Sequence, residues 1–384
     1  MMSRDNTIKV FFTLVRVGLF PVHDEGFMVN ESLFQDVEWE KVYQLAQEQS
    51  VLGLVLAGLE QYKNLNANLD LNIPKVLLLQ WIGEVQVIEQ RNKEMNAFID
   101  ELIEKLRKED VYAILVKGQG IAQCYEKPLW RSSGDVDLFL SDEYYQKAKE
   151  LLLPLGNITE PEEIAKKHFA MDIDGWAVEL HGTLKSGLSS NVERELDKLQ
   201  EDTFYGGQLR SYMNGQTQIF LLKAENDAFY IFTHILQHFY KEGVGLRQIC
   251  DWCRLMWTYK DSLNYGLLEQ RIKSAGLVSE WKAFGALAVD YLGMPVAAMP
   301  FYSDSTKWKK KARLIMEFVL KSGNMGHNRD MSHFSKYPYL IRKCVSMGRR
   351  ISDLINHARI FPLDSLRFFP RIMFNGVRSA MKGE

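Results

Sequence analysis

Residues 115–120 read LVKGQG and residues 134–140 read GDVDLFL, and these two stretches decide the fold. The first ends a short apolar run, 111–116, which suits a buried strand, and its glycines permit a tight turn into a following helix. The second begins another strand. Carboxylates at positions i and i+2 of a strand point to the same face, so we expect Asp135 and Asp137 to lie side by side.

Such a pair of carboxylates indicates a cation, and a solvated strand end is the competing explanation. Two like charges on one strand face are unfavourable, and a divalent metal ion removes that cost. With a rise of about 3.3 Å per residue, the Cβ atoms of Asp135 and Asp137 lie about 7 Å apart or less. That spacing suits one shared Mg²⁺ or a pair of Mg²⁺ ions, which prefer oxygen ligands. Val136 and Leu138 point to the other face, into the core.

The glycine turn is a candidate phosphate site. Gly118, Gln119 and Gly120 lie between the strand and a helix, and a helix start can offer backbone N–H groups to a phosphate. Lys117 and Arg131 could hold phosphate oxygens. A plain helix start, with surface or salt-bridge roles for the two cations, explains these residues equally well.

A third carboxylate lies on a predicted hairpin. Residues 168–181 read as two apolar strands joined by an Asp-Gly pair, which is a strong signal for a two-residue turn. Strand alternation puts Glu179 and His181 on one face. A charged residue in an otherwise apolar strand needs a reason, and a metal ion supplies one. An exposed hairpin face is the competing explanation, and Asp172 is a rival carboxylate nearby.

The rest of the chain carries mostly helical patterns. The predicted strands are 111–116, 135–140, 168–173 and 176–181, with a further hairpin over 208–219 that turns at Asn214-Gly215. The predicted helical segments are 36–63, 73–108, 121–125, 142–155, 221–241, 245–259, 264–275, 278–292, 305–321, 333–358 and 364–380. We therefore predict an α+β fold, with a helical N-terminal region (1–108), a small mixed-sheet core (109–220) and a helical C-terminal domain (221–384).

Composition excludes several classes of protein. The chain has 384 residues, 46% hydrophobic and 25% charged residues, and a net charge of −2, which is typical of a globular protein without a strong overall field. Four scattered cysteines do not form a disulfide scaffold, and we find neither a signal peptide nor a transmembrane run, so we expect a cytoplasmic protein. Residues 336–384 carry a local charge of +7, so nucleic acid remains a conceivable partner that the overall charge does not favour.

The segment from Leu115 to Leu138 resembles the nucleotidyltransferase superfamily that includes DNA polymerase β, whose signature is a Gly-rich turn followed by Asp-x-Asp. Within it, the chain resembles an uncharacterised bacterial nucleotidyltransferase-like family. The quoted residues are Leu115-Val116-Lys117-Gly118, Tyr125, Arg131, Gly134-Asp135-Val136-Asp137-Leu138, Val178-Glu179-Leu180-His181, His234-x3-His238 and Leu246-Arg247-x3-Asp251. The resemblance covers residues 110–255 and is strongest over the Asp-x-Asp strand.

The resemblance implies transfer of a nucleoside monophosphate from an NTP, with ATP as the expected donor, to an unknown small-molecule or protein acceptor. Two Mg²⁺ ions held by Asp135, Asp137 and Glu179 would bind the triphosphate and activate the acceptor hydroxyl. Gly118 and Gly134 would lie at the nucleotide. The family's usual Gly-Ser is Gly118-Gln119 here, so the serine contact to phosphate is missing.

Residues of the helical domain have two explanations each. His234 and His238 lie one helical turn apart and suit either a metal ion or helix packing. By resemblance, His181, His234 and His238 are also possible contacts to the acceptor or within the helical domain. Arg247 and Asp251 form an i, i+4 pair that suits a helix-face ion pair or, by resemblance, contacts with the acceptor. Cys250-x2-Cys253 lacks a second pair, so we do not predict zinc there.

Two alternatives to an active enzyme stay open. A nucleotide-binding regulatory protein without turnover is consistent with the missing serine. A toxin–antitoxin nucleotidyltransferase that acts on tRNA is consistent with the basic C-terminal end, and salt-sensitive RNA binding would support it.

Overall fold

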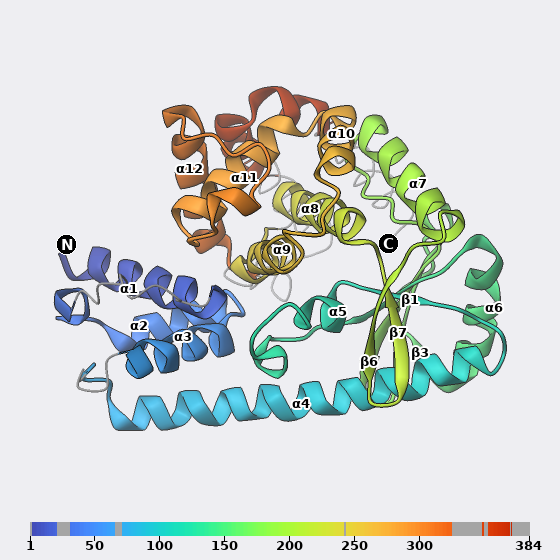
Figure 1. The fold of residues 1–384 in the computed structure, drawn as a ribbon, viewed down its shortest axis with the longest axis horizontal. Coiled ribbons are helices and arrows are strands. Elements are labelled where there is room, and N and C mark those ends of the chain that lie inside the picture. The colour runs from blue at the N-terminus through green and yellow to red at the C-terminus, as the bar shows by residue number, and fades with distance from the viewer. Residues whose placement is uncertain are drawn as a thin grey trace.

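A computed structural model describes residues 2–20, 31–65, 71–241, 243–324, 348, 352–368 and 370. It has a mixed α+β architecture, as predicted, with helices before and after one mixed sheet (Figure 1). Predicted helices 333–358 and 364–380 lie largely outside the described residues. Within them, 352–360 and 362–368 are helical. Among the helices that the structure describes, none is long and apolar enough to cross a bilayer.

The sheet has seven strands in the order β3-β4-β5-β2-β1-β7-β6. The strands are β1 (Ile114–Val116), β2 (Val136–Phe139), β3 (Asn157–Ile158), β4 (His168–Ile173), β5 (Trp176–His181), β6 (Arg210–Asn214) and β7 (Thr217–Leu221). The pairs β2/β5 and β1/β7 are parallel, and the other neighbours are antiparallel. The two parallel pairs place the predicted hairpins on either side of the Asp-x-Asp strand and its partner β1.

Helices precede the strands of this sheet, lie between them and follow them along the chain. Before it come α1 (Met2–Leu19), α2 (Trp39–Glu48), α3 (Leu52–Leu65) and α4 (Lys75–Arg107). Within it lie α5 (Gly118–Ala122), α6 (Asp142–Leu152) and α7 (Ser190–Tyr205). After it come α8 (Ala224–Lys241), α9 (Leu246–Thr258), α10 (Tyr265–Ala275), α11 (Val278–Asp290) and α12 (Thr306–Ser322).

Helix α4 links the N-terminal helices to the sheet. Its 33 residues span about 50 Å at 1.5 Å per residue, along the lower edge of Figure 1. Trp81 and Val85, in its first half, belong to the core shared with α1, α2 and α3. Ile99 and Leu102, in its second half, pack with Val136 and Leu138 on one face of the sheet. One helix therefore fixes the position of the N-terminal helices relative to the core.

The other face of the sheet joins the same large core as the N-terminal helices. Phe139 and Val116 belong to it, together with residues of α8, α9 and α11. Because side chains alternate along β2, Val136 and Leu138 pack on one face of the sheet. Asp137 and Phe139 lie on the opposite face, toward the C-terminal helices.

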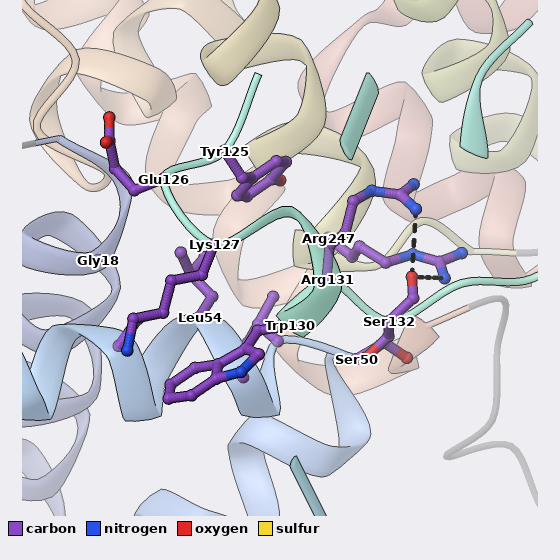
Figure 2. Close-up of a pocket in the computed structure, with 13 residues that line it drawn as sticks. Gly18, Ser50, Leu54, Tyr125, Glu126, Lys127, Trp130, Arg131, Ser132 and Arg247 are labelled. Atoms are coloured by element: carbon purple, nitrogen blue, oxygen red, sulfur yellow. Dashed lines mark hydrogen bonds between the residues drawn. The ribbon is translucent and has the colours of Figure 1, made fainter. Parts of the chain in front are cut away.

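Glycines allow the N-terminal helices to approach their neighbours closely. A Cβ atom on Gly58 would lie 2.0 Å from the backbone oxygen of Leu14, so α1 and α3 cross at short range. A Cβ atom on Gly53 would lie 2.1 Å from the backbone oxygen of Trp130, in the loop that leads to the Asp-x-Asp strand. Figure 2 shows this junction, where a cavity of only about 30 Å³ remains, room for about one water molecule.

The structure corrects several predicted boundaries. Helix α5 starts at Gly118 rather than at 121, so the glycine turn is itself the first turn of the helix. The apolar segment 36–63 is divided between α2 and α3, with Ser50 between them at a positive φ of 54°. Helices α1 and α7 and the short strand β3 were not predicted. Val192, Leu196 and Leu199 of α7 lie at helical spacing on its buried side, after the N-cap residue Ser189, so the sequence did carry a signal for this helix.

A buried carboxyl group makes the stability of the fold pH-dependent. Burial, and the nearby carboxyl group of Asp364, raise the pKa of Glu280 to about 8. A carboxyl group with a raised folded-state pKa stabilises the fold below its unfolded pKa, and this contribution is lost as the pH rises through the folded pKa. The free energy of unfolding should therefore fall by a few kcal/mol between about pH 5 and about pH 9, at about 1.4 kcal/mol per unit of pKa shift.

Glu280→Gln tests this expectation. The variant should be more stable than the wild type at about pH 9 and nearly equal to it at about pH 5. Thermal unfolding at both pH values measures the difference, with Glu101→Gln, on the exposed side of α4, as the matched control. Equal pH dependence in the wild type and Glu280→Gln would refute this role of Glu280.

Candidate active site

The register of the sheet brings the predicted carboxylates together. Asp137 pairs with Val116 of β1 on one side and with Glu179 of β5 on the other. Asp137 is 5% exposed, whereas Asp135, just before the strand, is exposed. Parallel strands in this register point Asp137 and Glu179 to the same face. Asp137 and Glu179 therefore lie together on one face of the sheet, and Asp135 lies just before β2 beside them.

Lys117 occupies the centre of this cluster. Its Nζ lies 2.7 Å from Oδ1 of Asp137, and both side chains are largely buried. Burial alone would lower the pKa of Lys117, but Asp137 and Glu179 outweigh it, so the pKa is raised and the ammonium group stays charged. Lys117 also has a φ of 58° and a ψ of −146°. This conformation costs a non-glycine residue about 1–3 kcal/mol, and such strain is concentrated at functional sites.

Two histidines surround Glu179. Nε2 of His181 lies 2.8 Å from Oδ1 of Asp137 and 3.4 Å from Oε2 of Glu179. Nε2 of His168, opposite His181 on β4, lies 3.1 Å from the same oxygen of Glu179. His181 was predicted as a contact to the acceptor or the helical domain. It lies within the carboxylate cluster, where it connects Asp137 to Glu179.

The cluster shifts the pKa values of Asp135 and Glu179 in opposite directions. Burial, and the charges of Asp137 and Glu179, raise the pKa of Asp135. Burial would also raise the pKa of Glu179, but hydrogen bonds from His168 and His181 and the charge of Lys117 hold it well below its ordinary value. The donor set fits a divalent cation, because all three carboxylates offer oxygen ligands and the like charges around Asp135 favour added positive charge.

Two cavities meet at Lys117, Asp135 and His234. The first, of about 320 Å³, extends toward the glycine turn and α9. Its other lining residues are Ser50, Gly118, Ile121, Arg131, Ser132, Ser133, Gly134, Asp137, Ile231, Ile235, Arg247, Gln248, Asp251 and Asn324. The second, of about 360 Å³, extends along β4, β5 and α8. Its other lining residues are Glu160, Glu163, Lys166, His168, Glu179, His181, Thr183, Leu184, Lys185, Ser186, Tyr230, Thr233, Gln237 and His238.

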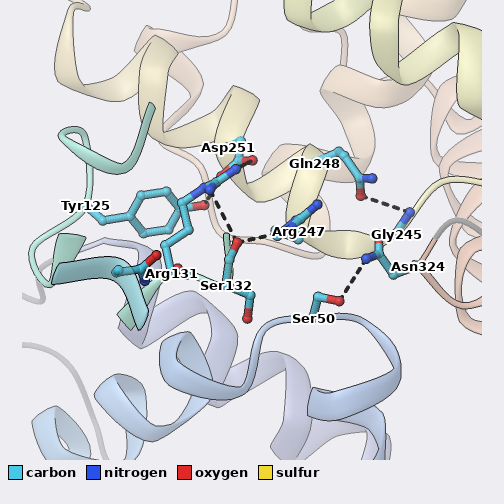
Figure 3. A network of polar contacts seen from close by, with 10 residues as sticks. Ser50, Tyr125, Arg131, Ser132, Gly245, Arg247, Gln248, Asp251 and Asn324 are labelled. Carbon is cyan, nitrogen blue, oxygen red and sulfur yellow. Dashed lines mark hydrogen bonds and ion pairs between the residues drawn. The ribbon is translucent and has the colours of Figure 1, made fainter. Parts of the chain in front are cut away.

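Arg131 forms a salt bridge, which is one of the two explanations that the sequence left open for it. Its Nε and Nη2 donate to the two carboxylate oxygens of Asp251, each at 2.7 Å, and Tyr125 donates a further hydrogen bond to Asp251 at 2.8 Å (Figure 3). Both partners are buried. The predicted ion pair between Arg247 and Asp251 is therefore wrong, because Asp251 accepts from Arg131 instead. The pair connects the loop before β2 to α9.

The loop that carries Arg131 is held from a second direction. Asn92 of α4 donates to the backbone oxygens of Leu129 and Arg131, at 2.7 and 2.8 Å. Trp130 donates to Glu89 at 2.8 Å. The loop between α5 and β2 is thus fixed to both α4 and α9, which positions Gly134 and Asp135 at the cavity entrance.

Gln119 does not replace the missing serine. Its side chain is 3% exposed, and its amide donates to Oδ1 of Asn92 at 2.7 Å and contacts the sulfur of Met95. The side chain therefore faces α4 rather than either cavity. Gly120 is also buried, and a Cβ atom there would lie 2.7 Å from Leu221. Of the glycine turn, Gly118 lines the first cavity.

Arg247 lines the first cavity and forms no ion pair with a carboxylate among the described residues. Its Nη1 donates to the backbone oxygen of Ser132 at 2.9 Å, and its Nε has no hydrogen-bond partner among the described residues (Figure 3). Burial and the charge of Arg131 lower the pKa of Arg247, and Asp135 opposes that shift. An incompletely paired guanidinium beside Asp135 is suited to bind an anion.

His234 and His238 face the second cavity as a pair. Their Nε2 atoms lie 3.0 Å apart on α8. Burial, and the charges of Lys117 and His238, lower the pKa of His234 well below its ordinary value, so its ring is neutral. Cys250 and Cys253 are buried free thiols of α9.

Several lining residues were not predicted. Ser132 and Ser133 lie in a polar loop that carries no distinctive pattern. The position of His168 could have been predicted. A two-residue turn at Asp174-Gly175 pairs residue 173 with 176, and each step away from the turn on one strand matches one step on the other. That register places His168 opposite His181, as the structure shows.

Comparisons with known proteins agree with this geometry. Residues 35–293 match the profile of a family described as uncharacterised nucleotidyltransferase. Comparisons with curated proteins and with solved structures gave no match. The matched range includes α2 to α11 and therefore the whole Asp-x-Asp cluster and most of both cavities. The chain belongs to this family of uncharacterised nucleotidyltransferases.

Proposed function

We propose that the protein transfers a nucleoside monophosphate from an NTP, with ATP as the expected donor, to a small hydroxyl-bearing acceptor. The observation that carries the proposal is the meeting of two cavities at Lys117 and Asp135, beside the Asp-x-Asp strand. A transferase needs two substrates with their reacting atoms in contact. Two adjacent cavities that share one wall of charged residues meet that need.

The first cavity is the proposed donor site. Gly118, Ser132 and Ser133 supply a glycine turn and hydroxyl groups, and Arg247 supplies a cation. Backbone N–H groups, hydroxyls and a guanidinium are suited to bind phosphate oxygens. Helix α5 has only five residues, so we assign the phosphate to these groups and not to a helix dipole.

The second cavity is the proposed acceptor site. Its volume of about 360 Å³ falls within the range for small-molecule sites, about 300–1,000 Å³. Hydrogen-bonding side chains such as Tyr230, Thr233 and Gln237 line it, and few apolar ones do. A polar small molecule is thus favoured over a protein side chain.

The chemistry breaks a phosphoanhydride bond of the donor and forms a phosphoester bond to the acceptor. An acceptor oxygen bonds to the α-phosphorus, the bond from that phosphorus to the β-phosphate bridge breaks, and pyrophosphate leaves. The acceptor proton passes to one of the three carboxylates. Asp135, Asp137 and Glu179 would hold one or two Mg²⁺ ions, which supply charge stabilisation for the triphosphate when bound. Lys117 keeps Asp137 oriented and adds positive charge at the junction.

Calorimetric titration with ATP, GTP, CTP and UTP, with and without Mg²⁺, tests the proposal. Magnesium-dependent binding of one triphosphate by the wild type is the expected result. A folded wild-type protein that binds none of the four triphosphates, alone or with a panel of small hydroxylated acceptors, would refute the donor site. Binding without transfer to any acceptor would instead favour a nucleotide-binding regulator.

Arg247→Met should weaken triphosphate binding by about 10–100-fold, the usual effect of losing a hydrogen bond to a charged group. The free energy of unfolding should change little, because Arg247 has no carboxylate partner to leave unpaired. Arg194→Met, which changes an exposed arginine of α7, is the matched control. Unchanged affinity in Arg247→Met would remove Arg247 from the donor site.

Location in the cytoplasm is part of the same proposal. Nucleoside triphosphates and reduced thiols occur together there, and Cys124, Cys250 and Cys253 are free thiols.

A further inference from the structure

Two imidazoles and one carboxylate converge on the sheet side of the acceptor cavity. They are His168 of β4 with Glu179 and His181 of β5, and their ligand atoms all lie within 4.8 Å of one another. His168 and His181 are directly opposed across the hairpin, and Glu179 lies two residues before His181 on the same face. His168 contacts Glu179 but is not among the proposed ligands of the Asp-x-Asp site.

The separations are those of neighbouring ligands around one metal ion. Nε2 of His168 and Nε2 of His181 lie 3.1 Å and 3.4 Å from Oε2 of Glu179. Two donors that are each about 2.1 Å from an ion lie about 3.0 Å apart at a right angle and about 3.4 Å apart at the tetrahedral angle. The cluster therefore needs only small side-chain shifts to share an ion.

We propose that His168, Glu179 and His181 form a site for a divalent transition-metal ion such as Mn²⁺, Co²⁺ or Zn²⁺. Imidazole nitrogen suits these ions, whereas Mg²⁺ prefers a full set of oxygen ligands. Two histidines and one carboxylate leave coordination positions open, and all three side chains line the acceptor cavity. Water or an acceptor oxygen can complete the coordination from that side.

The site adjoins the Asp-x-Asp carboxylates without coinciding with them. His181 contacts Oδ1 of Asp137 at 2.8 Å, and Glu179 belongs to both groups. The inference deepens the proposed function through this shared Glu179. Metal binding can nevertheless be measured without nucleotide, so the two proposals can fail separately.

Titration of the chelator-treated full-length protein with Co²⁺ tests the site, followed by the visible absorption of the bound ion. The wild type should bind one equivalent with a visible spectrum that excess Mg²⁺ does not abolish. His168→Gln should weaken binding at least about 100-fold, since even indirect partners of metal ligands contribute 10–100-fold. Asp135→Asn should keep the spectrum. A thermal unfolding transition like that of the wild type establishes that each variant is folded.

His238→Gln separates this site from the other histidine pair in the cavity. His234 and His238 also approach each other, at 3.0 Å, but they belong to no group of three possible metal ligands among the described residues. We expect His238→Gln to retain Co²⁺ binding. A spectrum lost in His238→Gln and kept in His168→Gln would move the ion to α8, and a wild type without a Co²⁺ spectrum would refute the site outright. Either result leaves the triphosphate measurements to decide the proposed function independently.

Discussion

Asp135→Asn is expected to weaken magnesium-dependent triphosphate binding at least about 100-fold, and Asp137→Asn to do the same. Each change replaces a charged oxygen ligand with a neutral amide, and a metal ion between two carboxylates depends on both charges. Calorimetry with the preferred triphosphate at fixed Mg²⁺ measures the loss. Asp142→Asn, at the exposed start of α6, is the matched control and should bind like the wild type.

The two variants should differ in stability although they agree in binding. Asp135 is held near Asp137 and Glu179, so losing its charge relieves repulsion and should raise the melting temperature. Asp137 accepts from Lys117 and His181, at 2.7 and 2.8 Å, so Asp137→Asn should cost roughly 2 kcal/mol. Sites that bind ligands commonly exchange stability for function in this way.

Thermal unfolding without metal measures this contrast. A stabilised Asp135→Asn that still bound Mg²⁺-triphosphate would show that Asp135 is not a metal ligand. Loss of binding in both variants, with opposite shifts in melting temperature, would agree with the arrangement around Lys117. Equal losses of stability would contradict the electrostatic account of the cluster.

The local sequence was sufficient for the part of the site that the sheet builds. Glycines after a buried strand, carboxylates at i and i+2, and a hairpin with an Asp-Gly turn are all short-range signals. Together they predicted β2, β4 and β5, with β4 and β5 to the residue. That Asp137 lies opposite Glu179 depends on a parallel pairing of strands about 40 residues apart. The resemblance to a family supplied it, and no local pattern could.

Side-chain partners across long separations could not be predicted. Gln119 follows the strand at the position of a familiar phosphate-binding residue, yet Asn92 and Met95 of α4 draw it to the other side. Its direction depends on how α4 crosses the sheet, which no pattern near residue 119 encodes. The division at residues 108 and 220 stays a prediction, and one large core runs across it from α1 to α12.

Asp251 illustrates the same limit. On its own helix, the i, i+4 neighbour Arg247 is the natural partner. In the structure Asp251 pairs with Arg131, 120 residues away. The planar guanidinium donates to both carboxylate oxygens, and the site is buried. This exchange leaves Arg247 at the cavity, where we propose that it binds phosphate.

Arg131→Met should therefore be strongly destabilising, by about 3–5 kcal/mol, because it leaves the charge of Asp251 buried with Tyr125 as its remaining hydrogen-bond donor. The double variant Arg131→Met/Asp251→Leu should recover most of that loss, since replacing a whole buried ion pair with apolar groups is often neutral. Denaturant unfolding of the two single variants and the double variant measures the coupling between the partners.

The same double variant decides between a structural and a phosphate-binding Arg131. A guanidinium that is fully engaged by Asp251 has no donors directed at the triphosphate, so the refolded double variant should keep most of its affinity, whereas Arg247→Met should not. If the double variant were stable yet failed to bind, Arg131 would contact the donor directly, or the Arg131–Asp251 pair would be needed to hold Ser132 and Ser133 in place. Adding Arg247→Met to the double variant separates these cases. If both arginines contact the triphosphate, their losses of affinity are coupled. If the loop is displaced instead, the contribution of Arg247 is already lost in the double variant.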